Sequence, residues 1–519
     1  MQRQPDPPAA PPGAPRRGRA PAPRVSPLRW LGVASGPAAA LAIALIPSGL
    51  HAIPGHGHRP AYAAAVAAWM ALWWLFEVLP IAITACLPLV LFPLLGVFGR
   101  GPAGDAARAV APFLDAYIFL FLGGMAIGAA MEQWSLHRRV ALHIMRAIGA
   151  DPRRLLLGML VATSAISLWI SNTATAVMMV PIGLALLAQL ESAAGGRRLS
   201  HFGTAIMLAV AYASNVGGIG TKIGTGVNSI FCGFLAEKLR RDVGFLQYMA
   251  IALPFVVLFV PLLWLALWRV GRRDGLAAGH ARDVLDSELA AMGPMSRGEK
   301  KVAAVFAAAS ALWILGDPLR AAIAPHLQAA LRGLGAAMGS DAVATFAVRG
   351  KHVEAGVAIL AASSLLALRA LSLASLRRMP WGTLVLLGGS FAMAAGIEGG
   401  GLSAWMAAQL AAVAEAPLLA QIGLASAGTI ALSALASNTA TVNVALNVLP
   451  RDLGVLFAAT IAASCDFMLP AGTPPNAIVF GSGYVRLPAM IRTGFLLDVA
   501  AAVLITAYVY GYARHLFVG

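Results

Sequence analysis

The chain reads Ser-Asn-Thr-Ala-Thr twice, at residues 171–175 and again at residues 437–441. Each copy lies in an apolar stretch and is followed by a loop ending in asparagine, which reads Gly-Thr-Gly-Val-Asn at 224–228 and Gly-Thr-Pro-Pro-Asn at 472–476. Hydroxyl and amide groups at membrane depth are costly unless they bind a ligand or one another. Two matching polar breaks in two hydrophobic halves therefore predict a secondary transporter with internal repeats and one shared binding site.

The composition is that of a membrane protein. Of the 519 residues, 59% are hydrophobic and only 12% are charged, and the mean hydropathy is +0.77. These values predict an all-α polytopic membrane protein rather than a soluble enzyme. The formal net charge of +16 does not indicate a nucleic-acid partner, because the basic residues cluster outside the apolar segments and no aromatic residues are interleaved with them. The clusters instead predict which side of the membrane is cytoplasmic.

Charge and apolar runs divide the chain into four parts. Residues 1–27 are rich in Pro, Ala and Arg and are expected to form a disordered basic cytoplasmic tail rather than a signal peptide. Residues 28–271 are expected to hold the first membrane repeat with its preceding helices, the first of them near 31–50. A polar cytoplasmic linker, 272–301, should join it to the second repeat, 302–519. The mixed stretch 324–352 is not assigned to any element.

A pair of glycines also occurs once in each half. Gly123-Gly124 precedes the first Ser-Asn-Thr motif at nearly the same separation as Gly388-Gly389 precedes the second. A lone glycine pair in a membrane helix usually indicates close helix packing. The shared order of glycine pair, Ser-Asn-Thr motif and glycine-threonine loop predicts two inverted repeats, each with a helix broken at its Ser-Asn-Thr motif.

The polar breaks suit ions of both signs. Backbone N–H groups at the start of a half-helix favour an anion, and free carbonyls at the end of the other half suit a hard cation such as Na⁺. No Ser-His-Asp set, metalloprotease helix or phosphate-binding loop is visible, and the three cysteines are far apart. We therefore expect no enzyme activity, and no cofactor beyond Na⁺ as a coupling ion.

Several segments between about 70 and 500 resemble the divalent anion:sodium symporter family, which carries dicarboxylates, citrate or sulfate. The resemblance rests on both Ser-Asn-Thr motifs and on four further stretches: Trp73–Pro80, Leu120–Gly124, Leu136–Leu142 and Ser464–Val479. It implies a homodimer in the membrane, with a scaffold and an elevator-type transport domain in each protomer. It also implies re-entrant hairpins near 113–131 and 381–400. The alanine, glycine, proline and arginine excess suggests a bacterial inner membrane, and the arginines within the first thirty residues predict a cytoplasmic N-terminus.

The resemblance also implies roles for individual residues. The first Na⁺ site would use Ser167, Ser171, Asn172 and the Gly224 carbonyl. The second would use Ser433, Ala436, Asn438 and the Gly472 carbonyl. The residues implied to meet the substrate carboxylates are Asn172, Thr173, Thr225, Asn438, Thr439 and Thr473.

Two ionisable residues depart from the family pattern, and both are candidates for coupling. Lys222 lies just before the first glycine-threonine loop, and Asp466 lies before the second. An ionisable group at membrane depth is a functional candidate. We hypothesise that the Lys222 ammonium replaces or weakens the first Na⁺. Two alternatives are that Lys222 extends to the surface or that Lys222 and Asp466 neutralise each other.

The function expected from these observations is Na⁺-coupled uptake of a small dianion, with a C4-dicarboxylate such as succinate, malate or fumarate as the first candidate. A Na⁺-independent dicarboxylate exchanger and a sulfate or citrate transporter are alternatives of the same class. A non-transporting membrane scaffold or sensor is the alternative from another class, but it would not require two intact polar breaks. Hydroxyls and amides bind carboxylate and sulfate alike, so the sequence leaves the anion open.

Overall fold

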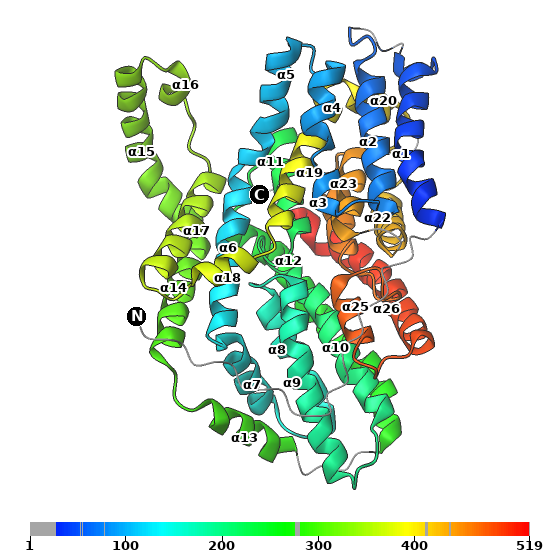
Figure 1. Ribbon diagram of the computed structural model, residues 1–519, viewed down its shortest axis with the longest axis vertical. Coiled ribbons are helices and arrows are strands. Elements are labelled where there is room, and N and C mark those ends of the chain that lie inside the picture. Colours follow the sequence, from blue (N-terminus) through cyan, green and yellow to red (C-terminus); the bar gives the residue numbers. More distant parts are fainter. Residues whose placement is uncertain are drawn as a thin grey trace, which may run out of the picture.

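The computed structural model describes residues 27–51, 53, 55–76, 78–275, 281–409, 414–434 and 437–517, and within these ranges it contains helices and no strand. The all-α prediction is therefore confirmed (Figure 1). The predicted tail, Glu77 and Ala436 lie outside the described residues, apart from Pro27, which begins the first helix. That helix ends at Leu45, before the predicted limit near residue 50.

The first half of the chain contains α1 (Pro27–Leu45), η1 (Gly49–His51), α2 (Arg59–Leu75), α3 (Ile81–Thr84), α4 (Leu87–Leu95), α5 (Gly101–Val110), η2 (Ala111–Leu114), α6 (Ala116–Gln133), α7 (Leu136–Ile148), α8 (Pro152–Ser167), α9 (Asn172–Ala193), α10 (Ser200–Gly218), α11 (Gly226–Lys238) and α12 (Phe245–Gly271). Pro80 lies between α2 and α3 and caps the start of α3, a position where a helix tolerates proline well.

The second half contains η3 (Arg272–Asp274), α13 (Ala281–Met292), α14 (Arg297–Ile314), α15 (Gly316–Met338), α16 (Asp341–Ala344), α17 (Gly350–Ala367), α18 (Leu373–Arg378), α19 (Trp381–Gly399), α20 (Leu402–Gln409), α22 (Leu418–Ser433), α23 (Asn438–Val448), α24 (Leu453–Ala462), α25 (Pro474–Phe480), α26 (Leu487–Tyr508), η4 (Val509–Ala513) and α27 (Arg514–Leu516).

Several helices meet the requirements for crossing a membrane. Within the described residues, 5 helices are long and apolar enough, and the pair α14–α15, bent by 84°, would make a sixth. The stretch 324–352, which the sequence left unassigned, forms most of α15, all of α16 and the start of α17. Figure 1 shows α15 and α16 standing apart from the rest of the molecule at the upper left.

Each Ser-Asn-Thr motif lies where one helix ends and the next begins. In the first half α8 ends at Ser167 and α9 begins at Asn172, and in the second half α22 ends at Ser433 and α23 begins at Asn438. The two helices of each pair contact each other, so the chain turns back at the motif. In both turns the serine hydroxyl caps the second helix, since it accepts a hydrogen bond from the N–H three residues later.

The prediction of re-entrant hairpins at the glycine pairs is wrong. Residues 116–133 and 381–399 each form one continuous helix, α6 and α19. The glycines serve helix packing instead: a Cβ on Gly123 would lie 2.5 Å from the Ala358 carbonyl oxygen, and one on Gly389 would lie 2.0 Å from the Ala85 carbonyl oxygen. The polar turns lie instead between α8 and α9 and between α22 and α23.

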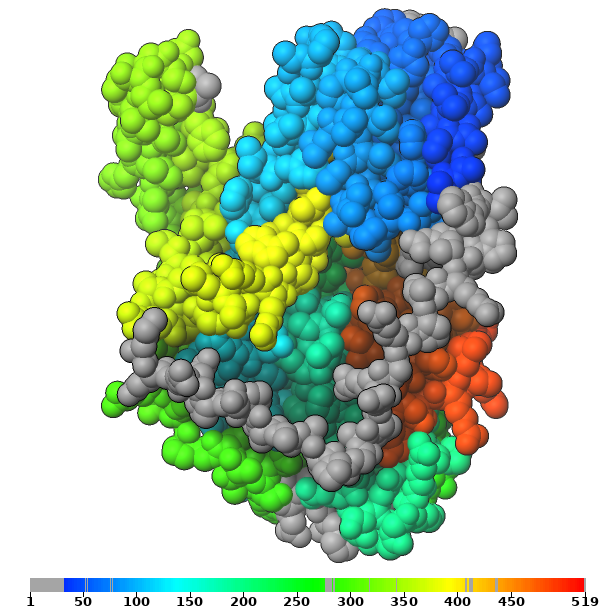
Figure 2. Space-filling view, in the orientation of Figure 1, coloured from blue at the N-terminus to red at the C-terminus, as the bar shows by residue number. Residues whose placement is uncertain are grey.

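The segment predicted as a linker is partly helical. Its helix α13 packs against α7 and α9, and Glu288 of α13 forms an ion pair with Arg138 of α7. Farther along, Glu299 at the start of α14 forms an ion pair with Arg139, at 2.7 Å. The segment 272–301 is thus held against the first half of the chain in its described parts. Figure 2 shows α18 and the start of α19, in yellow, lying across the front of the molecule.

Candidate functional site

One large cavity, of about 1040 Å³, is lined by residues from both halves of the chain. All six residues predicted to meet the substrate line it, namely Asn172, Thr173, Thr225, Asn438, Thr439 and Thr473. Helices of the two halves pack across this region, since α25 contacts α9 and α10 while α11 contacts α23. The fold therefore brings together two motifs that lie far apart in the sequence.

Helix starts surround the cavity. The first residues of α9, α11 and α23 all line it, and so does the cap residue Thr225 that precedes α11. The first N–H groups of a helix have no partner within the helix, and the helix dipole places partial positive charge at that end. The starts of these helices around one cavity, together with threonine hydroxyls and asparagine amides, form a site suited to an anion.

Behind the first motif, oxygen atoms converge where α8 and α10 end. The Ser167 hydroxyl lies 3.1 Å from Asn172 Oδ1 and donates to the Ser214 carbonyl at 2.6 Å. Gly218 faces the same amide, because a Cβ there would lie 2.1 Å from Asn172 Oδ1. The Gly224 backbone lies against the carbonyls of Ser167 and Gly218. The Ser171 hydroxyl differs from these groups, because it accepts the Ala174 N–H and so caps α9.

The second motif repeats this arrangement. The Ser433 hydroxyl lies 3.1 Å from Asn438 Oδ1 and donates to the Ala463 carbonyl at 2.8 Å. Gly472 lies beside the Asp466 carboxyl group, which is 1% exposed. Ala436, predicted as a further ligand, lies outside the described residues. The two predicted cation regions thus share the same serine-asparagine contact, and the second one also has an acidic neighbour.

The asparagines that end the two loops have equivalent roles. Asn228 Nδ2 donates to the carbonyls of Gly218, Ile219 and Thr221, and Asn476 Nδ2 donates to those of Asp466 and Leu469. These bonds hold each loop in its turn beside the cavity. By the same spacing, Asp466 is the counterpart of Gly218.

Among the cavity-lining residues that the sequence reasoning missed are Asn215 and Arg378. Asn215, in α10, donates from Nδ2 to the Thr473 hydroxyl at 3.0 Å and so joins the two halves at the site. Its signal was available, because Asn215 is an isolated amide in an otherwise apolar stretch. Arg378, in α18, is an exposed cation on the cavity lining. It lies in no motif, so only the fold identifies it.

Lys222 is fully buried and forms an ion pair with Glu354 of α17. Its Nζ lies 2.8 Å from both carboxylate oxygens, and Glu354 is 3% exposed. Both alternatives weighed for this residue are wrong, since the ammonium neither reaches the surface nor pairs with Asp466. Among the described residues lining the cavity are its neighbours Ile223 and Thr225, but Lys222 is not among them. A role for Lys222 in coupling remains a hypothesis.

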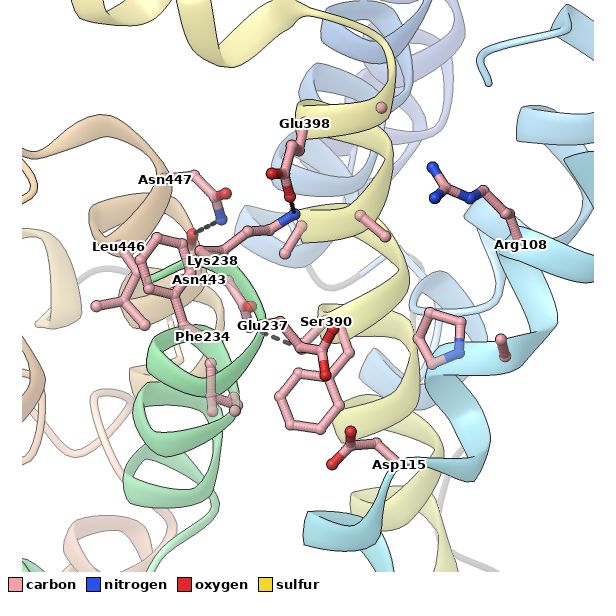
Figure 3. A pocket seen from close by; sticks show the side chains of 18 of the residues that line it. Arg108, Asp115, Phe234, Glu237, Lys238, Ser390, Glu398, Asn443, Leu446 and Asn447 are labelled. Atoms are coloured by element: carbon pink, nitrogen blue, oxygen red, sulfur yellow. Dashed lines mark hydrogen bonds and ion pairs between the residues drawn. The ribbon is translucent and has the colours of Figure 1, made fainter. Parts of the chain in front are cut away.

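A second cavity, of about 470 Å³, lies farther along the same helices (Figure 3). The large cavity meets α11, α19 and α23 near their starts, whereas this one is lined by their later residues. Lys238 of α11 and Glu398 of α19 form an ion pair at this cavity. At this cavity the Asn443 amide donates to the Ser390 hydroxyl at 2.7 Å, and Phe391 packs on Gly233. The two cavities therefore share the three helices α11, α19 and α23.

Comparison with known proteins gives consistent results. A family model described as the sodium:sulfate symporter transmembrane region matches residues 30–518. The sodium-dependent dicarboxylate transporters SdcS of Staphylococcus saprophyticus and of Staphylococcus aureus (strain bovine RF122) are 33% and 32% identical to the chain, and each match covers 86% of this chain and 85% of the relative.

Two solved transporter structures share the fold. The YdaH transporter of Alcanivorax borkumensis aligns with a TM-score of 0.52 at 15% identity, over 84% of this chain and 98% of that one. Neisseria gonorrhoeae MtrF aligns with a TM-score of 0.52 at 12% identity, over 87% of this chain and 97% of that one. At these identities the likeness concerns the fold alone.

Proposed function

The chain belongs to the sodium:sulfate symporter family, and we propose from this premise that it imports a small dicarboxylate together with Na⁺. As a member of this family it is an integral membrane transporter and not an enzyme. The proposed substrates are C4-dicarboxylates such as succinate, malate and fumarate. Relatives that are 33% and 32% identical carry the name of sodium-dependent dicarboxylate transporters, which supports a dicarboxylate over sulfate.

The observation that carries the proposal is the convergence of helix starts on one cavity. Helix N-termini, among them those of α9, α11 and α23, contribute partial positive charge, while the hydroxyls and amides of both motifs contribute hydrogen-bond donors. A dicarboxylate has two separated anionic groups, and the two motifs offer each of them a similar set of partners. A fixed arginine is then not required within either motif.

Na⁺ is the second cargo in this proposal. A hard cation binds oxygen atoms, and the regions behind the motifs supply them: Ser167, Ser171, Asn172 and the Gly224 carbonyl for one ion, and Ser433, Ala436, Asn438 and the Gly472 carbonyl for the other. Asn228 Oδ1, Asn476 Oδ1 and both Asp466 carboxylate oxygens are buried without a hydrogen-bond partner among the described residues. Such unpaired acceptors are consistent with cations in these regions.

The two cavities support alternating access. In the proposed cycle the large cavity is the open side of the path, and Ser390, Asn443 and Phe391, which line the second cavity, belong to the barrier that closes the other side. We propose that an elevator movement of one domain exchanges the two sides. We also propose two inverted repeats, a homodimer and a bacterial inner membrane location with a cytoplasmic N-terminus, all of which rest on the sequence pattern and the family resemblance.

The ion pair between Lys222 and Glu354 bears on the exchanger alternative. An ammonium whose charge is already balanced by a carboxylate at 2.8 Å does not supply a free positive charge to the site. This favours Na⁺ as the cation that accompanies the substrate. Sulfate remains the alternative substrate, because the family model carries that name.

The test is uptake of labelled succinate into proteoliposomes that contain the purified protein, with and without an inward Na⁺ gradient. Accumulation that requires Na⁺ and is lost in Asn172→Ala and in Asn438→Ala is the expected result. Gln328→Ala removes an amide from the outlying α15 and serves as the matched control. Uptake without Na⁺ that requires a dicarboxylate inside the vesicles would instead identify an exchanger, and sulfate uptake in place of succinate uptake would correct the substrate.

A further inference from the structure

Asp466 lies in the loop between α24 and α25 and is almost completely buried, at 1% exposure. Among the described residues, none donates a hydrogen bond to either of its carboxylate oxygens. The Ser433 hydroxyl is close enough to interact with this carboxyl group, but its single proton is donated to the Ala463 carbonyl at 2.8 Å. A buried acid with two unpaired oxygens is costly, so its surroundings require an explanation.

The carboxyl group is directed at the second cation region. Its Oδ2 lies 2.7 Å from the position that a Cβ on Gly472 would occupy, so the carboxylate lies directly against that backbone. The backbone carbonyl of Asp466 is held by Asn476 Nδ2 at 3.2 Å, which fixes the turn that carries the side chain. The Asp466 carboxylate therefore lies against the Gly472 backbone and beside the Ser433 hydroxyl, which in turn contacts Asn438 Oδ1.

The other buried acid nearby, Asp498 of α26, is in a different situation. Its Oδ1 accepts the Phe467 N–H at 2.8 Å, so this carboxylate has a backbone donor. Asp498, the acid that acts on Asp466 electrostatically, is thus already hydrogen-bonded to a backbone N–H. Asp498 cannot balance a charge on Asp466, because both groups are acids. A bound cation or a proton on the carboxyl group would balance it, and the experiment below distinguishes the two.

We propose that the Asp466 carboxylate is a direct ligand of the cation in the second site, beside Ser433, Asn438 and the Gly472 carbonyl. This inference rests on the proposed function, because it adds a charged ligand to the second Na⁺ site. The first site has no such ligand at the equivalent position, since Gly218 stands there and faces Asn172 Oδ1. The two cation sites of the protein are therefore chemically unequal.

The inequality sets an order of binding. A site that contains a carboxylate attracts Na⁺ on its own, whereas a site of neutral oxygens gains most of its attraction when the dianion is present in the adjoining cavity. Na⁺ therefore occupies the Asp466 site before the substrate binds. The first site fills together with the substrate.

The experiment measures binding of Na⁺ alone to the purified full-length protein, by Na⁺-dependent thermal stabilisation with choline as the replacement cation and no dicarboxylate present. Asp466→Asn keeps the size of the side chain and removes its charge. It is expected to raise the half-saturating Na⁺ concentration by about tenfold or more, because a charged ligand is lost from a buried site. Asp498→Asn is the matched control and should shift that concentration much less.

An unchanged half-saturating Na⁺ concentration in Asp466→Asn would overturn the proposal, and so would a wild-type protein that Na⁺ does not stabilise. If Asp466→Asn is recovered aggregated, Asp466→Ser is measured against the same criterion. Succinate uptake separates this proposal from the proposed function. If succinate uptake depends on Na⁺ but Asp466→Asn has the half-saturating Na⁺ concentration of the wild-type protein, only the Asp466 ligand is refuted. If that concentration rises tenfold in Asp466→Asn but succinate uptake does not depend on Na⁺, only the proposed transport is refuted.

Discussion

Removing one partner of the Lys222–Glu354 ion pair should destabilise the protein much more than removing both. Lys222→Met leaves a carboxylate buried without its partner, and Glu354→Gln leaves an ammonium in the same position. The two side chains are 0% and 3% exposed, so water does not replace the missing charge. In the double variant Lys222→Met/Glu354→Gln neither of these two positions carries a charge.

The size of the effect follows from the geometry of the pair. At the observed 2.8 Å and an effective dielectric constant of about 20, the attraction between the two charges is about 6 kcal/mol before the cost of desolvation. Breaking a buried pair by removing one partner costs about 3–5 kcal/mol, whereas replacing both partners by neutral groups is often close to neutral. Each single variant should therefore lose about 3–5 kcal/mol, and the double variant should recover most of that loss.

The assay is the thermal unfolding midpoint of the purified variants in detergent, followed by Na⁺-dependent succinate uptake in proteoliposomes. Arg154→Gln is the control, because it removes one partner of an exposed ion pair, 66% and 52% exposed, which contributes about 1 kcal/mol or less. The double variant should keep the half-saturating Na⁺ concentration of the wild-type protein, since Glu354 rather than a cation site takes up the Lys222 charge.

Two results would refute this reasoning. If the double variant were as unstable as the single variants, the pair would not be the reason for their loss. If the double variant were stable but took up succinate independently of Na⁺, or with a changed number of Na⁺ ions, Lys222 would be part of the coupling machinery after all. The second result would support the hypothesis that its ammonium replaces or weakens the first Na⁺.

Three further predictions concern residues at the large cavity. Gly218→Ala places a Cβ 2.1 Å from Asn172 Oδ1 and should raise the half-saturating Na⁺ for uptake by about tenfold, whereas Gly428→Ala, which meets open space, should leave it unchanged. Asn215→Ala removes the hydrogen bond between the halves and should raise the KM for succinate by roughly two- to tenfold; an unaltered KM would contradict a positioning role. Arg378→Ala should raise that KM by about two- to fivefold at low ionic strength and less at high salt, because exposed charges are screened, and a salt-independent effect would count against electrostatic attraction.

The sequence was sufficient to predict which residues line the large cavity, because its signal is local and duplicated. A Ser-Asn-Thr motif in an apolar segment already implies a helix break, since polar groups at membrane depth need partners. Two copies with similar companion loops imply a shared cavity, and all six residues named for the substrate line one cavity.

The errors arose where the outcome depends on a distant partner. Gly123-Gly124 is compatible with a tight turn and with close helix packing, and the choice is made by Ala358, far along the chain. Glu354, the partner of Lys222, lies 132 residues away. Neither partner is marked by a motif. Local pattern thus predicts which groups need partners, while the fold determines which partners they find.

The orientation of the motif asparagines shows how a dianion and a cation can depend on each other without an arginine. In each half the amide oxygen faces a serine hydroxyl, at 3.1 Å in both, where the preceding helix ends, while the same asparagine lines the cavity. In the proposed function a cation that binds the amide oxygen also fixes the amide plane, so its N–H groups are held toward the substrate. Asn172 and Asn438 then each join one cation to one carboxylate. Loss of one cation site should therefore weaken the binding of only one carboxylate of the dianion. Under the proposal for Asp466, the site at Asn438 is the one that binds its cation first.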